Sequence, residues 1–127
     1  MNLFFIAIGG AIGSVARALL SNFVLRATGS LFPLGTFIVN VIGCLIFGAV
    51  IGAAQHRFVL TPETRAFLLV GILGGFTTFS AFSLDTALLI ERHSFGLAAG
   101  YVVGSVAAGV SALFFGLAMF RGGHHLP

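Results

Sequence analysis

The side chains that could do chemistry in this chain gather in one glycine- and hydroxyl-rich stretch, inside the third of its long apolar runs. The residues of this stretch are Gly71, Gly74, Gly75, Phe76, Thr77, Thr78, Phe79, Ser80, Ala81, Phe82 and Ser83. Glycine and β-branched threonine form helices poorly, and a backbone group freed inside a membrane must find a protein, ion or water partner because lipid offers none. We therefore predict that the third run contains a helix break and that this break builds a site.

Two phenylalanines in this stretch add a second kind of chemistry. Phe79 and Phe82 are three residues apart, so they share one face of a helix. Such pairs form part of the core in most proteins, but the edge of an aromatic ring is weakly positive and can attract an anion while remaining apolar. Beside a broken helix, the pair is a candidate anion contact.

Further polar side chains lie in the apolar runs, where each is costly to bury. The amide of Asn40 can donate two hydrogen bonds and accept as well, so it could bind an ion or tie two helices together. Tyr101 and Ser105 stand one helical turn apart. Asp85 lies nearer the end of the third run than its centre, where its carboxylate could pair with an arginine or relay protons.

The elements that must position these groups follow from the composition. The chain has 127 residues, of which 58% are hydrophobic and 7% charged, and its mean hydropathy is +1.14. Such values are typical of an integral membrane protein, and an apolar run of about 20 residues crosses a bilayer as a helix. We expect one all-α membrane domain over residues 1–127, with four transmembrane helices at about 3–25, 34–54, 66–90 and 95–120.

The arginines indicate how the protein inserts, because orientation follows the difference in Lys and Arg between the two faces. One face carries Arg57, Arg65 and Arg121, and the other carries Arg26, Arg92 and, close to it, Arg17. Since the two faces balance, we infer that copies insert in both orientations and pair antiparallel. The formal charge of +3 is spread without a basic run, which argues against a nucleic-acid partner.

Enzyme motifs are missing from the sequence. It contains no phosphate-binding loop, no cysteine and histidine constellation for zinc, and no nucleophile with a base nearby. The single cysteine, Cys44, has no partner in the chain for a disulfide. We expect that the protein is not an enzyme and that any transport it supports is passive or ion-coupled.

Three motifs follow one another along the chain. They are Gly9-Gly10-Ala11-Ile12-Gly13 followed by Arg17, then Gly35-Thr36 with Val39-Asn40 and Gly43, then Gly74-Gly75-Phe76-Thr77-Thr78-Phe79-Ser80-Ala81-Phe82-Ser83. In this order and spacing they resemble the signatures of the small bacterial fluoride channels called the Fluc or CrcB family, and the match covers essentially the whole chain. The chain departs from the family pattern where Ala81 replaces a threonine, where Asp85 replaces the more common glutamate, and where Ala18 replaces an aromatic residue.

The resemblance implies a fluoride-selective channel through which cytoplasmic fluoride leaves by passive diffusion, which relieves fluoride toxicity. It implies a multi-pass protein of the bacterial inner membrane, surrounded by lipid and assembled as a dual-topology homodimer with two antiparallel pores. It also implies a structural Na⁺ at the dimer centre, held by the backbone carbonyls of Gly74 and Thr77.

By the same resemblance, the candidate residues of the fluoride pore are Asn40, Thr78, Phe79, Ser80, Phe82, Tyr101 and Ser105. Phe79 and Phe82 correspond to the pore-facing rings. Arg17 either contributes positive potential near a vestibule or forms an ion pair in helix packing. Fluoride is small and holds its water tightly, so a pore must replace that hydration with hydrogen-bond donors.

Two other classes of function remain open from the residues alone. A small proton-coupled multidrug exporter also has four helices and can insert in both orientations, but it needs a carboxylate within the membrane, typically in the first helix. The first run of this chain has none, so Asp85 would have to serve instead. An assembly subunit that transports nothing is the third class, and it predicts no ion flux from the purified protein.

Overall fold

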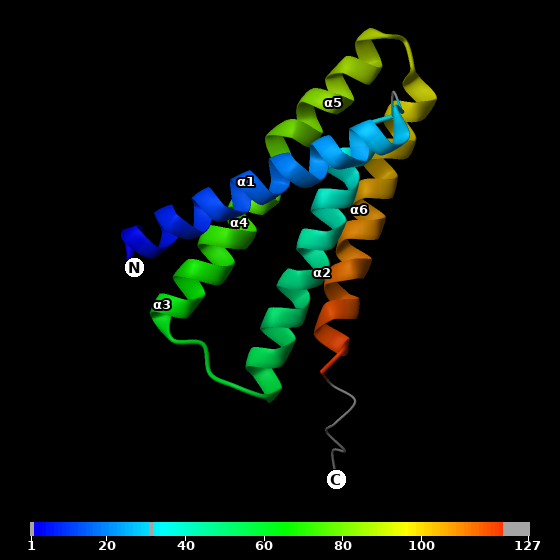
Figure 1. Ribbon diagram of the computed structural model, residues 1–127. Helices are drawn as coiled ribbons and strands as arrows, with labels where there is room; N and C mark the ends of the chain where they lie inside the picture. The colour runs from blue at the N-terminus through cyan, green and yellow to red at the C-terminus, as the bar shows by residue number, and fades with distance from the viewer. Residues whose placement is uncertain (1, 31, 121–127) are drawn as a thin grey trace.

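The computed structural model describes residues 2–30 and 32–120, and the elements of these residues are all helices (Figure 1). In chain order they are α1 (Leu3–Thr28), α2 (Leu34–His56), α3 (Pro62–Arg65), the π-helix η1 (Ala66–Leu73), α4 (Gly74–Phe76), α5 (Phe79–Glu91) and α6 (Phe95–Ala118). Four stretches are long and apolar enough to cross a membrane, namely Leu3–Thr28, Leu34–His56, Pro62–Glu91 and Phe95–Ala118. The chain is a multi-pass helical membrane protein.

The third span begins at Pro62, four residues earlier than the sequence predicts. Thr61 precedes it with extended backbone, and its hydroxyl accepts a hydrogen bond from the Thr64 N–H at 3.2 Å. This satisfies one of the donors that a helix start leaves free, and Pro62 suits the first helical position because it has no N–H to lose. The polar segment before the apolar run is therefore already helical.

Glycines bring the helices into contact in two pairs, α1 with η1 and α2 with α6. A Cβ atom added at Gly9 of α1 would lie 2.5 Å from the carbonyl oxygen of Phe67 in η1. A Cβ atom added at Gly48 of α2 would overlap the carbonyl oxygen of Leu113 in α6. Small residues are the usual means by which membrane helices approach closely, because lipid supplies no hydrophobic drive for association.

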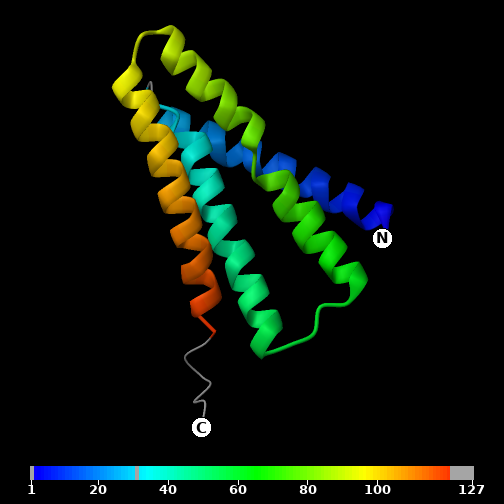
Figure 2. The ribbon, with the colours of Figure 1, turned by 180° about the vertical axis from the view of Figure 1, so that it is seen from behind.

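The two pairs are joined by α1, which crosses α2, and by the contact of α5 with α6 (Figures 1 and 2). A small cluster lies where α5 meets α6 and contains Leu89, Ala98 and Tyr101, with Phe32, Phe37 and Phe82 packed against it. At the other end of the molecule the ribbons of α2 and α3 lie apart and are linked by a loop (Figure 2). The middle of the third span, formed by η1 and α4, packs mainly on α1 and also contacts α2.

Four of the five arginines among the described residues lie at the two ends of the molecule, and the fifth, Arg17, lies within α1. Arg26 and Arg92 are at the end where α1 finishes and α5 turns into α6, whereas Arg57 and Arg65 are at the end where α2 is linked to α3. Arg121, which the sequence assigns to the second of these ends, lies outside the described residues. Two arginines at each end are compatible with either orientation.

Candidate functional site

The helical backbone of the third span is interrupted at Thr77 and Thr78, which separate α4 from α5. Thr77 has φ −84° and ψ 154°, and Thr78 has φ −148° and ψ 120°, so both are extended. The hydroxyl of Thr78 then accepts a hydrogen bond from the N–H of Ala81 at 3.1 Å and caps the start of α5. Thr77 is the C-cap residue of α4 and Thr78 is the N-cap residue of α5, so the interruption is a defined local structure.

Asn40 of α2 holds the extended backbone at Thr78. Its side-chain nitrogen donates to the Thr78 carbonyl at 3.0 Å, and its side-chain oxygen accepts from the Thr78 N–H at 2.8 Å. A side-chain amide carries both a donor and an acceptor, so it can pair in this way with the N–H and the C=O of one residue. Of the two roles that the sequence leaves open for Asn40, the structure therefore shows the one that ties two helices together.

Two carbonyls of the third span lose their usual helical donors at this point. In a continuous α-helix the Thr78 N–H would donate to the carbonyl of Gly74, and the Ala81 N–H would donate to the carbonyl of Thr77. The first N–H is bonded to Asn40 instead, and the second to the hydroxyl of Thr78. The carbonyls of Gly74 and Thr77 are the two that the family resemblance assigns to a sodium ion.

A third carbonyl of the interruption is satisfied by Arg17. The side-chain Nε of Arg17, from α1, donates to the carbonyl oxygen of Gly75 at 3.1 Å. The same arginine lines a cavity of about 140 Å³ together with Ser21, Thr36 and Thr78. The sequence predicts for Arg17 either a vestibule charge or a partner in helix packing; the hydrogen bond adds the specific role of fixing the backbone beside the interruption.

A groove of about 390 Å³ runs beside the extended residues, between α2, the start of α5 and α6. Its lining residues are Asn40, Gly43, Cys44, Phe47, Thr77, Thr78, Phe79, Phe82, Ser105, Val106, Gly109 and Leu113. The hydroxyl oxygen of Ser105 is buried and has no hydrogen-bond partner among the described residues. A buried donor without a partner is costly, which marks Ser105 as a group able to receive a ligand or water.

The two phenylalanines of the groove differ in exposure. Phe79 is 79% exposed, whereas Phe82 is half-buried and packs against Tyr101, with ring centroids 5.1 Å apart. The centroids of Phe79 and Phe82 are 5.6 Å apart, so the rings of this pair are in contact as their spacing predicts. Phe79 is too exposed to be a core residue of this chain, and most of it is accessible at the surface of the subunit.

The other two predicted pore residues are not among the residues that line the groove. Tyr101 is completely buried in the cluster behind Phe82, and its hydroxyl donates to the Asp85 carboxylate at 3.2 Å. Ser80 is exposed, and its hydroxyl lies 3.2 Å from that of Thr78. The sequence analysis suggests an arginine as the partner of Asp85, whereas in the structure the Asp85 carboxylate accepts a hydrogen bond from the neutral hydroxyl of Tyr101.

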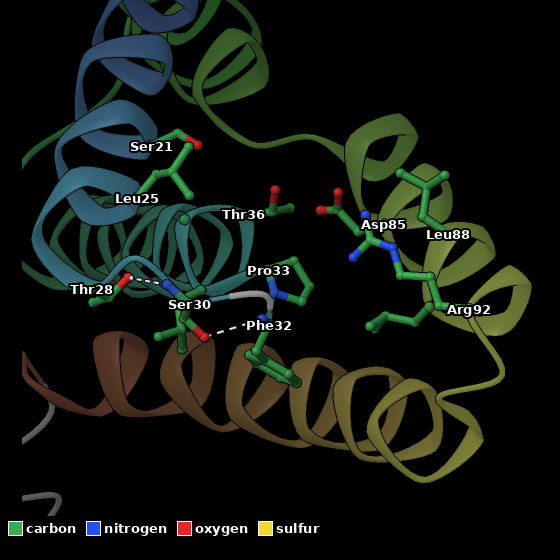
Figure 3. A pocket seen from close by; sticks show the side chains of 13 residues that line it. Ser21, Leu25, Thr28, Ser30, Phe32, Pro33, Thr36, Asp85, Leu88 and Arg92 are labelled. Carbon is green, nitrogen blue, oxygen red and sulfur yellow. Dashed lines mark hydrogen bonds between the residues drawn. The ribbon is translucent and has the colours of Figure 1, made fainter.

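A polar pocket that the sequence analysis missed lies at the end of α1, between α2 and α5 (Figure 3). Its volume is about 310 Å³, and its polar lining residues are Ser21, Thr28, Ser30, Thr36, Asp85 and Arg92. Figure 3 shows the Asp85 carboxylate and the Arg92 guanidinium facing the same space as the Thr36 hydroxyl. Ser21 and Thr28 are seven residues apart on α1, a spacing that puts both on one helix face and could have indicated the pocket.

The fold and the site together define a small multi-pass membrane protein with its polar groups gathered at mid-span. The chain belongs to the CrcB family: the family model described as "CrcB-like protein, Camphor Resistance (CrcB)" matches residues 4–117. This confirms the family recognised from the three motifs.

Close relatives cover nearly the full length of the chain. A protein of Nitrobacter hamburgensis named "Fluoride-specific ion channel FluC 2" is 46% identical over 95% of this chain and 98% of its own length. A protein of Agrobacterium fabrum named "Fluoride-specific ion channel FluC" is 44% identical over 95% of this chain and 97% of its own length. A protein of Novosphingobium aromaticivorans with the same name is 50% identical over 93% of this chain and 94% of its own length. The relatives are named as ion channels, and each alignment covers more than nine tenths of this chain.

Proposed function

We propose that this protein is a fluoride-selective channel through which cytoplasmic fluoride leaves by passive diffusion, which relieves fluoride toxicity. One observation carries the proposal: beside the interrupted third span, the groove is apolar except for a few donor groups, of which the buried Ser105 hydroxyl has no hydrogen-bond partner in the part of the chain that the structure describes. A fluoride pore needs donors that replace hydration in a dry passage. The names of the relatives give fluoride as the ion.

The pore residues have different tasks in this proposal. The ring edges of Phe79 and Phe82 contact the anion, and the hydroxyl of Ser105 donates a hydrogen bond to it. Ser80, which does not line the groove of the single subunit, has its hydroxyl 3.2 Å from that of Thr78. Thr78 and Asn40 fix the extended backbone at the mouth of the groove, and the second N–H of the Asn40 amide is a further donor. Tyr101 supports the ring of Phe82 from behind and orients Asp85. Carbonyl oxygens would repel fluoride, and those of Gly75 and Thr78 are occupied by hydrogen bonds from Arg17 and Asn40.

The channel is proposed to be an antiparallel homodimer in the bacterial inner membrane. The groove is open along one side of the single subunit, and Phe79 at its rim is largely exposed. A second copy that covers this side would enclose the passage and exclude lipid from it. Two described arginines at each end, Arg26 and Arg92 against Arg57 and Arg65, support insertion in both orientations, with Arg17 lying inside α1.

A structural Na⁺ is proposed at the centre of this dimer, on the carbonyls of Gly74 and Thr77. These two residues fit the ion, because both carbonyls have lost their helical donors and a hard cation prefers oxygen ligands. When bound, Na⁺ would supply the positive charge that the missing N–H groups no longer provide. The protein's own part is to hold the carbonyls in place through Asn40, Thr78 and Arg17.

The function is tested by ion efflux from liposomes that contain the purified protein. We expect rapid release of fluoride and far slower release of chloride. The Phe82→Ile substitution should slow fluoride release by about two- to tenfold, if the contact of a ring edge with the anion is worth roughly 0.5–1.5 kcal/mol, as contacts between aromatic rings are. The matched control is Phe114→Ile on α6, whose ring is 59% exposed outside the groove, and it should not change the rate. Chloride release as fast as that of fluoride would contradict the proposal.

The proposed Na⁺ predicts a stability that depends on sodium. A ligand that binds only the folded state raises its stability with concentration, so the thermal midpoint of the purified protein should be higher in NaCl than in N-methylglucamine chloride of equal ionic strength. The fraction that elutes as a dimer should rise in parallel. Equal midpoints in both salts would rule out the sodium site without affecting the proposal of a fluoride channel.

A further inference from the structure

The loop that joins α2 to α3 lies at one end of the molecule (Figure 1), and two of its apolar side chains are exposed. Val59 is 88% exposed and Phe58 is 46% exposed. Both lie outside any helix, between His56 at the end of α2 and Pro62 at the start of α3. Exposed apolar residues on the spanning helices face the hydrocarbon interior, so these two require an explanation of their own.

The length of the loop fixes its depth. Val59 is three residues from His56 and three from Pro62, and an extended residue covers at most about 3.6 Å. Val59 therefore lies within roughly 11 Å of the ends of two membrane spans. This distance is comparable with the thickness of one headgroup region, which adds about 5–8 Å on each side of the hydrocarbon core.

Charged residues flank the apolar pair on both sides. Arg57 precedes it, with its guanidinium 6.0 Å from the ring centroid of Phe120, and Glu63 and Arg65 follow it at the start of the third span. Arginine beside aromatic and aliphatic side chains is typical of the membrane interface, where the cation meets lipid phosphates and the apolar groups enter the acyl chains.

The other end of the molecule is built differently. There the described apolar loop residue Phe32 is covered by protein, because its ring packs edge-on against Tyr101 with centroids 5.4 Å apart. The turn from α5 to α6 consists of Arg92, His93 and Ser94, which are polar. Exposed apolar side chains in the described loops are thus concentrated in the connection between α2 and α3.

We propose that Phe58 and Val59 insert into the boundary between headgroups and acyl chains, with Arg57 at the level of the phosphates. The partner of this loop is the lipid surface itself. Insertion fixes the depth of His56 and Pro62, which end two of the four spans. The inference depends on the membrane topology and not on the identity of the transported ion.

The experiment uses the absence of tryptophan from the sequence. A Val59→Trp variant carries a single indole at a position where the replaced side chain is almost fully exposed. In phosphatidylcholine vesicles we expect blue-shifted emission, with strongest quenching by lipids brominated near the top of the acyl chain. Vesicles contain the same boundary in both leaflets, so either orientation gives the same result.

The matched control is Val70→Trp, in η1 of the third span, where the side chain is 46% exposed. Its strongest quenching should come from lipids brominated deeper in the chain. Red-shifted emission of the loop indole, quenched by acrylamide but not by bromolipid, would place the loop in water and overturn the proposal. Blue-shifted emission without bromolipid quenching would also overturn it, because another copy of the chain would then cover the loop. Gel filtration of both variants checks that they fold.

Discussion

The Asn40→Asp substitution is expected to abolish fluoride efflux from liposomes. Aspartate keeps the oxygen that accepts from the Thr78 N–H but loses the nitrogen that donates to the Thr78 carbonyl. The carbonyl is then left unpaired beside a carboxylate, and an unsatisfied partly buried polar group costs about 1–3 kcal/mol. In addition, a negative charge at the mouth of the groove repels the anion that must enter it.

The control for this variant is the same substitution at Asn2, the residue before α1. The side-chain oxygen of Asn2 accepts from the N–H groups of Phe4 at 3.1 Å and Phe5 at 3.4 Å, and no donation by its nitrogen is needed. Aspartate caps helices as well as asparagine does, so Asn2→Asp should conduct like the original protein. Fluoride efflux from Asn40→Asp at the original rate would show that the pairing with Thr78 does not matter for conduction.

The Gly13→Ala substitution is expected to have the largest effect on folding. A Cβ atom at this position of α1 would overlap the carbonyl oxygen of Ile72 and approach the backbone N–H of Phe76 at 2.9 Å. Backbone atoms cannot move aside as a flexible side chain can, so the cost should reach or exceed about 3 kcal/mol, the upper part of the range for overpacking. The measurement is the thermal midpoint in detergent, together with the fraction that survives gel filtration.

Gly10→Ala is the matched control, one helical turn away on the same element. A Cβ atom at Gly10 would meet nothing within 4 Å. Because alanine forms helices better than glycine by about 1 kcal/mol, this variant should be as stable as the original or slightly more stable. Equal thermal midpoints for the Gly10 and Gly13 variants would contradict the close approach of α1 to the third span.

The spanning helices could be predicted from the sequence because their signal is local. Apolar runs of membrane length identified all four spans, and the ends of α2 and α6 differ from the predicted ones by two residues. The first turn of the third span was missed because its residues, from Pro62 to Arg65, are polar. The signal was nevertheless present, since a threonine followed by a proline is a typical helix start.

The partners of the polar side chains could not be predicted, because they are far apart in the sequence. Asn40 bonds to Thr78 across 38 positions, and Arg17 bonds to Gly75 across 58. Hydropathy and spacing indicate which side chains are costly to bury, but they do not say which backbone group each one reaches. The π-helical winding of η1 has no signal of its own in the sequence either, because its residues suit an α-helix equally well.

The glycine contact between α1 and the third span also determines its stiffness. Where Gly9 meets Phe67 and Gly71, main chain lies directly on main chain, and no rotamer can change to absorb a displacement. The two segments must therefore shift together as one rigid body. Bending of the third span is left to the pair of extended threonines, where hydrogen bonds to Asn40 and not a helical ladder set the resistance.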